Sequence, residues 1–163
     1  LVGSEMCIRD SPNAVLSGFA NPKMGEWINS TLEADLLEPG AFDATAPYRD
    51  GTRLLEAEGG TYLRPTIVHC NSMDHALANR EFLCPYASVV EVPQREMLRA
   101  IGPTLVVTAI TKDEIFKRQL LGASNVERLN LGPISTMKIS WDQPHEGNMF
   151  EFLYKRRSIG MAA

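Results

Sequence analysis

Four histidine and cysteine side chains in the middle of the chain are of the types that bind zinc: His69, Cys70, His75 and Cys84. Their spacing matches no known metal-binding pattern. His69 and Cys70 are neighbours in a segment with strand character, so their side chains are expected to point to opposite faces. We therefore predict no metal site. Cys84 needs a basic or helix-terminal environment to become a nucleophile, and a packed, unreactive thiol is the favoured interpretation.

The densest polar cluster is "PHEGN" at Pro144–Asn148. A loop that carries His, Glu and Asn beside a glycine turn can be functional, because loops on rigid scaffolds often carry function. It can equally cap the helix predicted to follow it. Both interpretations stay open. The chain contains no G-x-G-x-x-G, P-loop or G-x-S-x-G motif.

Composition excludes several classes of protein. With 163 residues, 44% hydrophobic and 22% charged, the chain has the make-up of a folded globular protein. A net charge of −4 gives no basic footprint, so no nucleic-acid partner is predicted. No apolar run approaches the ~20 residues that cross a bilayer, so no membrane association is predicted. The cysteines form no disulfide framework, which favours a reducing, cytoplasmic location.

The first eleven residues, "LVGSEMCIRDS", have no helical or strand periodicity. They also lack the basic start and apolar core of a signal peptide. Their back-translation resembles a transposase adapter used in preparing DNA libraries. We therefore expect residues 1–11, with Cys7, to be an adapter-derived artefact. The remaining stretch, 12–163, is expected to be one part of a longer domain.

The first half of the chain combines one helix with short strands. Asn21-Pro22 predicts a helix start, and the helix is expected to run to about Leu36. Four apolar residues are expected to share its buried face: Met24, Trp27, Ile28 and Leu32. A turn-rich stretch (41–51) follows, then a hairpin of residues 53–57 and 61–70 around a glycine turn, and a short helix over 73–81.

Strands and helices alternate in the second half. Strands are predicted at 87–92, 104–111 and 125–132, with helices at 93–102 and 112–123 between them. The strand at 104–111 is predicted to be buried on both faces. The apolar side of the second helix should hold Ile115, Phe116, Leu120 and Leu121. A helix carrying Met149, Phe152 and Leu153 is expected after the polar loop, and "SIGMAA" shows no clear strand. The pattern predicts an α/β fold, a partial, mostly parallel sheet with flanking helices.

Four segments occur in the order seen in the C-terminal part of the aldehyde dehydrogenase superfamily. They are "LRPTIV" (63–68), "REFLCPYASVVEV" (80–92), "TAITKD" (108–113) and "ERLNLG" (127–132). In the family these correspond to a P-T-v segment, an E-E-x-F-G-P motif before a strand, a T-x-D strand–helix junction and a v-x-i-N strand. The chain from Pro12 onward thus resembles a divergent bacterial member, whose tail departs from the P-F-G-G of the commonest members.

This resemblance implies a site for NAD or NADP. The second Glu of the family motif accepts hydrogen bonds from the nicotinamide ribose hydroxyls, and Glu81 stands at that position. The family's Phe, which packs beside the nicotinamide, is replaced by Leu83, and its Gly by Cys84. Asn130 matches the asparagine that supports the substrate channel. Without the resemblance, Glu81 is interpreted as a surface charge at a helix end. Asn130 is then interpreted as a strand-end residue whose side chain holds the backbone in place.

The resemblance also implies a reaction. The family oxidises a small-molecule aldehyde to a carboxylate through a cysteine thioester and is usually oligomeric, so a homo-oligomeric parent is expected. Neither Cys70 nor Cys84 falls where the nucleophile should be, so no catalytic residue is assigned and the fragment alone is expected to be inactive. The alternatives are an acyl-CoA or acyl-phosphate reductase of the same superfamily, or a stand-alone, non-catalytic α/β binding domain.

Overall fold

The computed structural model describes residues 18–57, 60–136 and 158–161. The described residues fall into two compact units, the first ending at Val92 and the second starting at Pro93. Each unit has its own cluster of buried apolar side chains. The two are described separately below.

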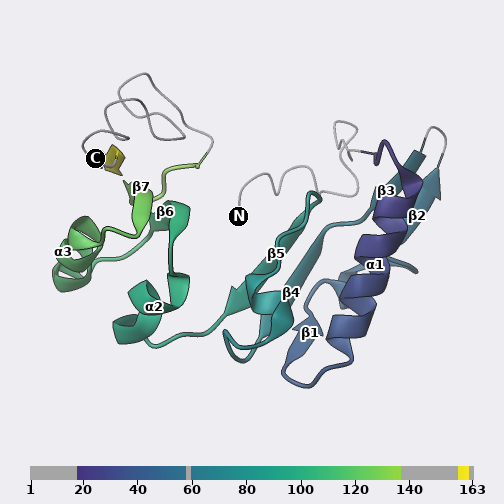
Figure 1. Ribbon diagram of the computed structural model, residues 1–163, viewed down its shortest axis with the longest axis horizontal. Coiled ribbons are helices and arrows are strands. Elements are labelled where there is room, and N and C mark those ends of the chain that lie inside the picture. Colours follow the sequence, from purple (N-terminus) through teal and green to yellow (C-terminus); the bar gives the residue numbers. More distant parts are fainter. Residues whose placement is uncertain (1–17, 58–59, 137–157, 162–163) are drawn as a thin grey trace. The chain divides into compact units, whose positions relative to one another are not determined.

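The first unit contains one α-helix, two sheets and two short 3-10 helices (Figure 1). Its elements are α1 (Pro22–Leu36), β1 (Ala41–Asp43), η2 (Ala46–Tyr48), β2 (Leu54–Ala57), β3 (Gly60–Leu63), β4 (Thr66–Cys70), η3 (Ala76–Asn79) and β5 (Tyr86–Val90). Strands β2 and β3 form an antiparallel pair. The other sheet has the order β1-β4-β5, with β4 parallel to β5 and antiparallel to β1.

Helix α1 begins where its sequence predicts. The side chain of Asn21 accepts a hydrogen bond from the backbone N–H of Lys23 at 3.1 Å, and Pro22 occupies the first helical position. The helix ends at Leu36, before Gly40, whose φ of 102° suits a residue without a side chain. The predicted helix is therefore confirmed at both ends.

The buried face of α1 differs from the predicted one. Gly25, Ile28 and Leu32 are buried, whereas Met24 and Trp27 are exposed. The reason is the close approach of the helix to its neighbours: a Cβ on Gly25 would lie 3.0 Å from Cδ2 of Phe19 and 3.1 Å from Cγ2 of Thr61. Because α1 packs through this glycine, the helix is turned so that Trp27 leaves the core.

The predicted pairing of two strands is confirmed by β2 and β3, but the second arm ends at Leu63; the residues between the arms, 58–59, lie outside the described residues. After Arg64-Pro65 the chain enters β4, which pairs with β1 and β5 instead of continuing the hairpin. The stretch predicted to be turn-rich also contains strand β1, whose Phe42 is paired with His69 of β4. The helix predicted over 73–81 is a shorter 3-10 helix, η3.

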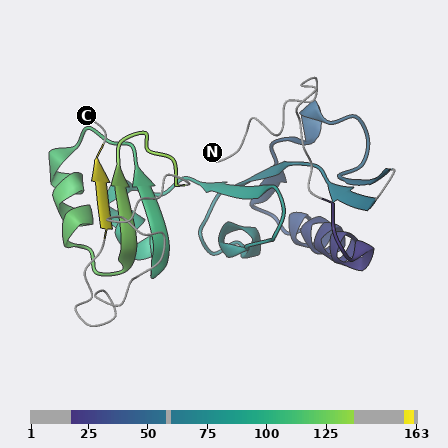
Figure 2. The same cartoon turned by 90° about the horizontal axis from the view of Figure 1, so that it is seen from above.

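The second unit is a three-stranded sheet with two helices. Its elements are α2 (Gln94–Ile101), β6 (Thr104–Ala109), α3 (Glu114–Gly122), β7 (Val126–Leu131) and β8 (Ser158–Met161). The strands run parallel in the order β6-β7-β8, which Figure 2 shows side by side with β8 in yellow. Phe116 and Leu120 of α3, together with Met97 and Leu98 of α2, pack against Leu129 and Leu131 of β7.

Three details of the second unit correct the sequence-based expectation. Ser158–Met161 forms strand β8 beside β7, although no strand was predicted there. Strand β6 is not buried on both faces, since Leu105 is exposed. On α3, Phe116 and Leu120 are buried as predicted, but Ile115 and Leu121 are exposed. The predicted helix with Met149, Phe152 and Leu153 lies outside the described residues.

The predicted α/β class, with parallel strands and flanking helices, is confirmed. Within the described residues, the strands are divided among three sheets. The alternating pattern of strands and helices predicts that β5 and β6 share one sheet, but they belong to different sheets. Of the helices in the described part of the chain, none combines the length and apolar character that crossing a membrane requires.

Candidate functional site

The segment that carries the two predicted cofactor-binding residues, Glu81 and Leu83, connects η3 to β5. Both side chains are exposed, and Leu83 is 94% exposed. Phe82 between them is buried. Phe82 is thus held in the core, while its two neighbours lie at the surface. We call residues 80–84 the Glu81 segment.

Phe82 anchors this segment through aromatic contacts. Its ring meets that of Trp27 edge-on at 6.2 Å between centroids, and that of Tyr86 edge-on at 5.1 Å. The hydroxyl of Tyr86 donates to the backbone carbonyl of Leu77 at 2.7 Å, which fixes η3 against the start of β5. Burial raises the pKa of Tyr86 to about 12, so this hydroxyl keeps its proton at neutral pH.

Arg80, on the other side of Glu81, is tied to α1. Its Nη2 donates to Oδ2 of Asp35 at 2.7 Å. The backbone of Arg80 is extended, with φ −83° and ψ 134°. Glu81 thus lies between two residues that are each fixed to α1, since Phe82 contacts Trp27 of the same helix.

A shallow hollow of about 300 Å³ lies at the start of α1, lined by Asn21, Lys23, Met24 and Trp27. Trp27 is 56% exposed and also carries the edge contact with Phe82. Trp27 therefore lines the hollow and also contacts the Glu81 segment through Phe82. The hollow was not predicted because Met24 and Trp27 were expected in the core. The residue that could have indicated it is Gly25, whose close packing turns both side chains outward.

The thiol of Cys84, at the end of the segment, is half-buried. Burial raises its pKa to about 11, so at neutral pH it is almost entirely protonated. Cys70 is fully buried in β4, and burial raises the pKa of its thiol as well. These positions suit packed thiols and do not suit a nucleophile.

The histidines considered for zinc binding make other contacts. His69 stacks on Phe42 with ring centroids 5.1 Å apart, and its Nε2 lies 3.9 Å from Oε1 of Glu91. The Nδ1 of His75 accepts from the backbone N–H of Leu77 at 3.1 Å and begins η3. Within the described ranges, no three His, Cys, Asp or Glu side chains lie close enough together to hold a metal ion.

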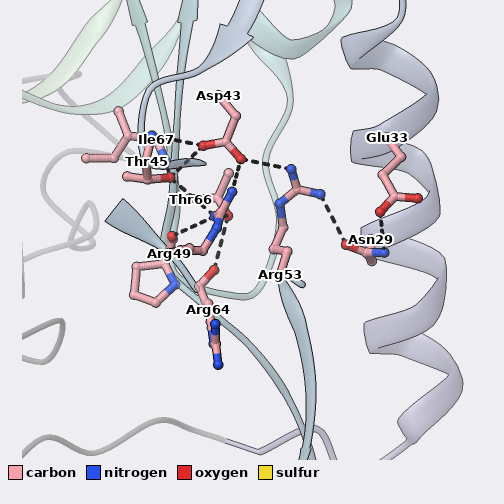
Figure 3. Close-up of polar contacts among 10 residues, drawn as sticks. Asn29, Glu33, Asp43, Thr45, Arg49, Arg53, Arg64, Thr66 and Ile67 are labelled. Carbon is pink, nitrogen blue, oxygen red and sulfur yellow. Dashed lines mark hydrogen bonds and ion pairs between the residues drawn. The ribbon is translucent and has the colours of Figure 1, made fainter. Parts of the chain in front are cut away.

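A buried ionic cluster was not predicted from the sequence. Asp43 at the end of β1 accepts from Arg49, Arg53 and Thr45 (Figure 3). Burial alone would raise the pKa of Asp43, but hydrogen bonds from Thr45, Arg53 and Arg49 hold it below its ordinary value.

Arg49 and Arg53 use their remaining donors to bind other parts of the protein. Arg49 also donates to the carbonyl of Pro65 at 3.2 Å and to the hydroxyl of Thr66 at 3.0 Å, and Arg53 donates to Oδ1 of Asn29 at 3.1 Å. Because these guanidinium groups already face protein acceptors, the cluster joins α1, β1 and β4 and leaves little capacity for a ligand.

Asn130 lies at the centre of the second unit and is completely buried in β7. Its Nδ2 donates to Oγ1 of Thr108 on the neighbouring strand at 3.2 Å, and that hydroxyl donates to the carbonyl of Ile134 at 3.3 Å. Thr108 thus ties the loop after β7 to β6, and Asn130 contacts that hydroxyl from the neighbouring strand, while its own Oδ1 is buried without a hydrogen-bond partner. His145 and Glu146, in the polar cluster at Pro144–Asn148, lie outside the described residues.

Comparison with protein-family models and with curated proteins finds no match for this chain. The evidence for a site is therefore the geometry of the first unit. There, an exposed carboxylate and an exposed large apolar side chain flank the buried Phe82, whose ring contacts Trp27 at the edge of the hollow.

Proposed function

We propose that this chain is part of an NAD(P)-dependent aldehyde dehydrogenase, in which the Glu81 segment binds the nicotinamide ribose. The observation that supports this most directly is the outward presentation of Glu81 and Leu83 on either side of the buried Phe82. A carboxylate has two acceptor oxygens and can receive hydrogen bonds from both hydroxyls of a ribose. An exposed leucine beside it offers apolar surface to the adjoining ring.

The roles of the chain's own residues follow from this arrangement. Glu81 accepts the ribose hydroxyls and Leu83 covers part of the ring, while Trp27, which contacts Phe82 between them, lines the hollow. When bound, the dinucleotide would supply the hydride acceptor, and loss of a hydride to it would oxidise the aldehyde carbon. Neither Cys70 nor Cys84 suits covalent catalysis, so the proposal gives the described residues a part in cofactor binding and none in thioester formation.

A non-catalytic binding domain is the second candidate, since each unit encloses its own buried cluster. Several large apolar side chains are exposed in the two units, such as Leu37, Ile110 and Met161, and a longer enzyme chain would offer surface to cover them.

The test uses the gene product that includes the codons upstream of Pro12. Purified protein is mixed with NAD or NADP and a panel of aldehydes, and formation of the reduced nicotinamide is followed by absorbance. Glu81→Gln should raise the Michaelis constant for the dinucleotide about tenfold, because hydrogen bonds to a charged acceptor are lost. Glu56→Gln, which alters an exposed carboxylate on β2, should leave it unchanged.

Each outcome decides between the candidates. Turnover that depends on dinucleotide and aldehyde, and is weakened by Glu81→Gln, supports the proposal. Reduction of an acyl thioester or acyl phosphate without aldehyde oxidation identifies a reductase of the same superfamily. Absence of any dinucleotide-dependent reaction or binding favours the non-catalytic domain. If turnover is normal in Glu81→Gln, Glu81 does not bind the ribose.

A further inference from the structure

The imidazole of His75 holds the beginning of η3. The backbone of His75 is extended, with φ −67° and ψ 137°, and its Nδ1 accepts a hydrogen bond from the backbone N–H of Leu77 at 3.1 Å. An acceptor placed in this way, called an N-cap, satisfies an N–H that has no partner within the helix. Serine, threonine, aspartate and asparagine usually supply the N-cap. Histidine differs from them because its acceptor nitrogen can take up a proton near neutral pH.

The hydrogen bond to Leu77 defines where the ring carries its proton. Because Nδ1 accepts, the proton of the neutral imidazole is on Nε2. Nε2 is buried and has no hydrogen-bond partner. The ring edge that carries it lies near the turn after α1, since a Cβ on Gly40 would be 3.9 Å from Cδ2 of His75. Within the part of the chain that the structure describes, no carboxylate lies within ion-pair distance of His75.

A protonated His75 does not fit this position. Both ring nitrogens would then be donors, so Nδ1–H would face the N–H of Leu77 instead of accepting from it. Nε2–H would place part of a positive charge in a buried position without an acceptor, which costs free energy. The protonated ring is therefore expected to move into water, and the hydrogen bond to Leu77 is lost when it does.

η3 is attached to β5 by two of its carbonyl groups. The carbonyl of Leu77 accepts from the hydroxyl of Tyr86 at 2.7 Å, and that of Ala78 accepts from the hydroxyl of Ser88 at 3.1 Å. The side chain of Leu77 is completely buried among the apolar residues of the first unit. Since both carbonyls belong to the turn that His75 begins, loss of the N-cap loosens η3 against β5.

Titratable groups also lie on the elements that contact η3, which are α1, β4 and β5. They include Asp35 of α1, which is paired with Arg80 after η3, Cys70 and His69 of β4, and Tyr86 of β5. Burial raises the pKa of the Cys70 thiol, and that of Tyr86 to about 12, so both groups stay neutral below about pH 8. His69 stacks on Phe42 instead of contacting η3. In the turn itself, Asp74 accepts from the hydroxyl of Ser72 at 3.1 Å.

We propose that His75 is a pH-sensitive N-cap: the neutral imidazole holds η3 against β5, and protonation releases η3. The stabilisation is present while the imidazole is neutral. It is lost as the pH falls from about 8 to about 5, the range in which histidine changes its charge. This property belongs to the fold of the first unit, so it is independent of dinucleotide binding.

Hydrogen–deuterium exchange with mass spectrometry tests the proposal on the complete gene product. The peptide that covers η3 is followed from about pH 8 to about pH 5, with rates corrected for the intrinsic dependence of exchange on pH. In the wild type its protection should fall about three- to tenfold as the pH is lowered, which is the loss expected for one N-cap. A peptide from β7 should keep its protection, which shows that the change is local.

His75→Asn separates the N-cap from its titration. Oδ1 of asparagine occupies the same bonding position as Nδ1 of histidine and accepts without taking up a proton. Protection in this variant should match the wild type at about pH 8 and stay constant down to about pH 5. His75→Ala should show low protection at both pH values. His69→Gln, which removes the histidine of β4, is the control and should respond to pH as the wild type does.

Several results would overturn the inference. They are a wild type whose protection of η3 does not change with pH, a His75→Asn variant that keeps the wild-type response, and an Asp74→Asn variant that loses it. The last result would assign the response to the neighbouring carboxylate. Nitrogen chemical shifts of the wild-type His75 ring give a second measurement that needs no substitution. They should show the proton on Nε2 at about pH 8, and a proton on Nδ1 would exclude the N-cap.

Discussion

Nη2 of Arg53 lies 2.9 Å from Oδ2 of Asp43, and the two side chains are only 8% and 7% exposed. Arg53 also reaches Asn29 on α1, so this contact connects the helix to the end of β1. A second guanidinium, that of Arg49, shares the same carboxylate. Three charged groups thus meet with little water, and the one carboxylate balances two cations.

Removing that carboxylate should destabilise the first unit strongly. We expect Asp43→Ala to lower the free energy of unfolding by about 3–5 kcal/mol, because it leaves two buried guanidinium groups without their counter-ion. Urea denaturation followed by circular dichroism measures the change. Glu114→Gln, at an exposed pair, should cost less than about 1 kcal/mol. A loss this small in Asp43→Ala would show that water replaces the carboxylate.

Lowering the pH should weaken the stabilisation that the Asp43 cluster provides. The pKa of Asp43 in the folded chain is below its ordinary value of 3.8, so the unfolded chain takes up a proton first as the pH falls. Asp43 therefore adds stability above its unfolded pKa, and that stability is lost as the pH falls through the folded pKa. Unfolding free energies measured between about pH 5 and pH 2 should fall less steeply in Asp43→Asn than in the wild type. Equal slopes would contradict the lowered pKa.

Cys84 should react slowly with alkylating reagents at neutral pH. With a pKa of about 11, it has about one thiolate per ten thousand molecules at pH 7. Peptide-level mass spectrometry after iodoacetamide treatment should show labelling far slower than for a free cysteine, with a rate that rises as the pH is raised toward 11. Cys70, which is fully buried, should be labelled only on unfolding. Fast labelling of Cys84 at neutral pH would return it to consideration as a nucleophile.

Two glycines of the second unit should respond oppositely to alanine. Gly102 ends α2 with φ 63° and ψ −162°, a conformation that side chains disfavour, although a Cβ there would meet no neighbour. We expect Gly102→Ala to cost about 1–3 kcal/mol through backbone strain. Gly122, at the end of α3, also has open space and no positive φ. Gly122→Ala should stabilise by up to about 0.5 kcal/mol. Equal effects in denaturant titrations would exclude strain at Gly102.

Local signals predicted the helices well. Asn21-Pro22 at the start of α1, and Pro93 and Gly102 around α2, act through their own backbone and nearest neighbours, so no tertiary information is needed. Which face of α1 is buried could not be predicted from such local signals. Trp27 and Gly25 both fit a helical face, and only the close approach of Phe19 and Thr61 decides that the glycine lies inside.

Strands whose pairing is distant were harder to predict. β1 has three residues and β8 contains a glycine, so neither has a strong propensity of its own, and each exists through its neighbour, β4 or β7. The candidate site was predicted only in part. The positions of Glu81 and Leu83 came from a motif, whereas the pairing of Arg80 with Asp35 joins two distant charges that no local pattern connects.

The position of β8 in its sheet has a consequence for how the second unit assembles. Thr104 of β6 pairs with Val126 of β7, while Ser158 of β8 pairs with Arg128, so the second ladder must close a longer stretch of chain. Loop closure costs more entropy as the loop lengthens, which makes β6-α3-β7 the part expected to form first. During synthesis these elements leave the ribosome before β8 emerges. Until β8 arrives, β7 presents an open strand edge on which nascent chains can misassociate.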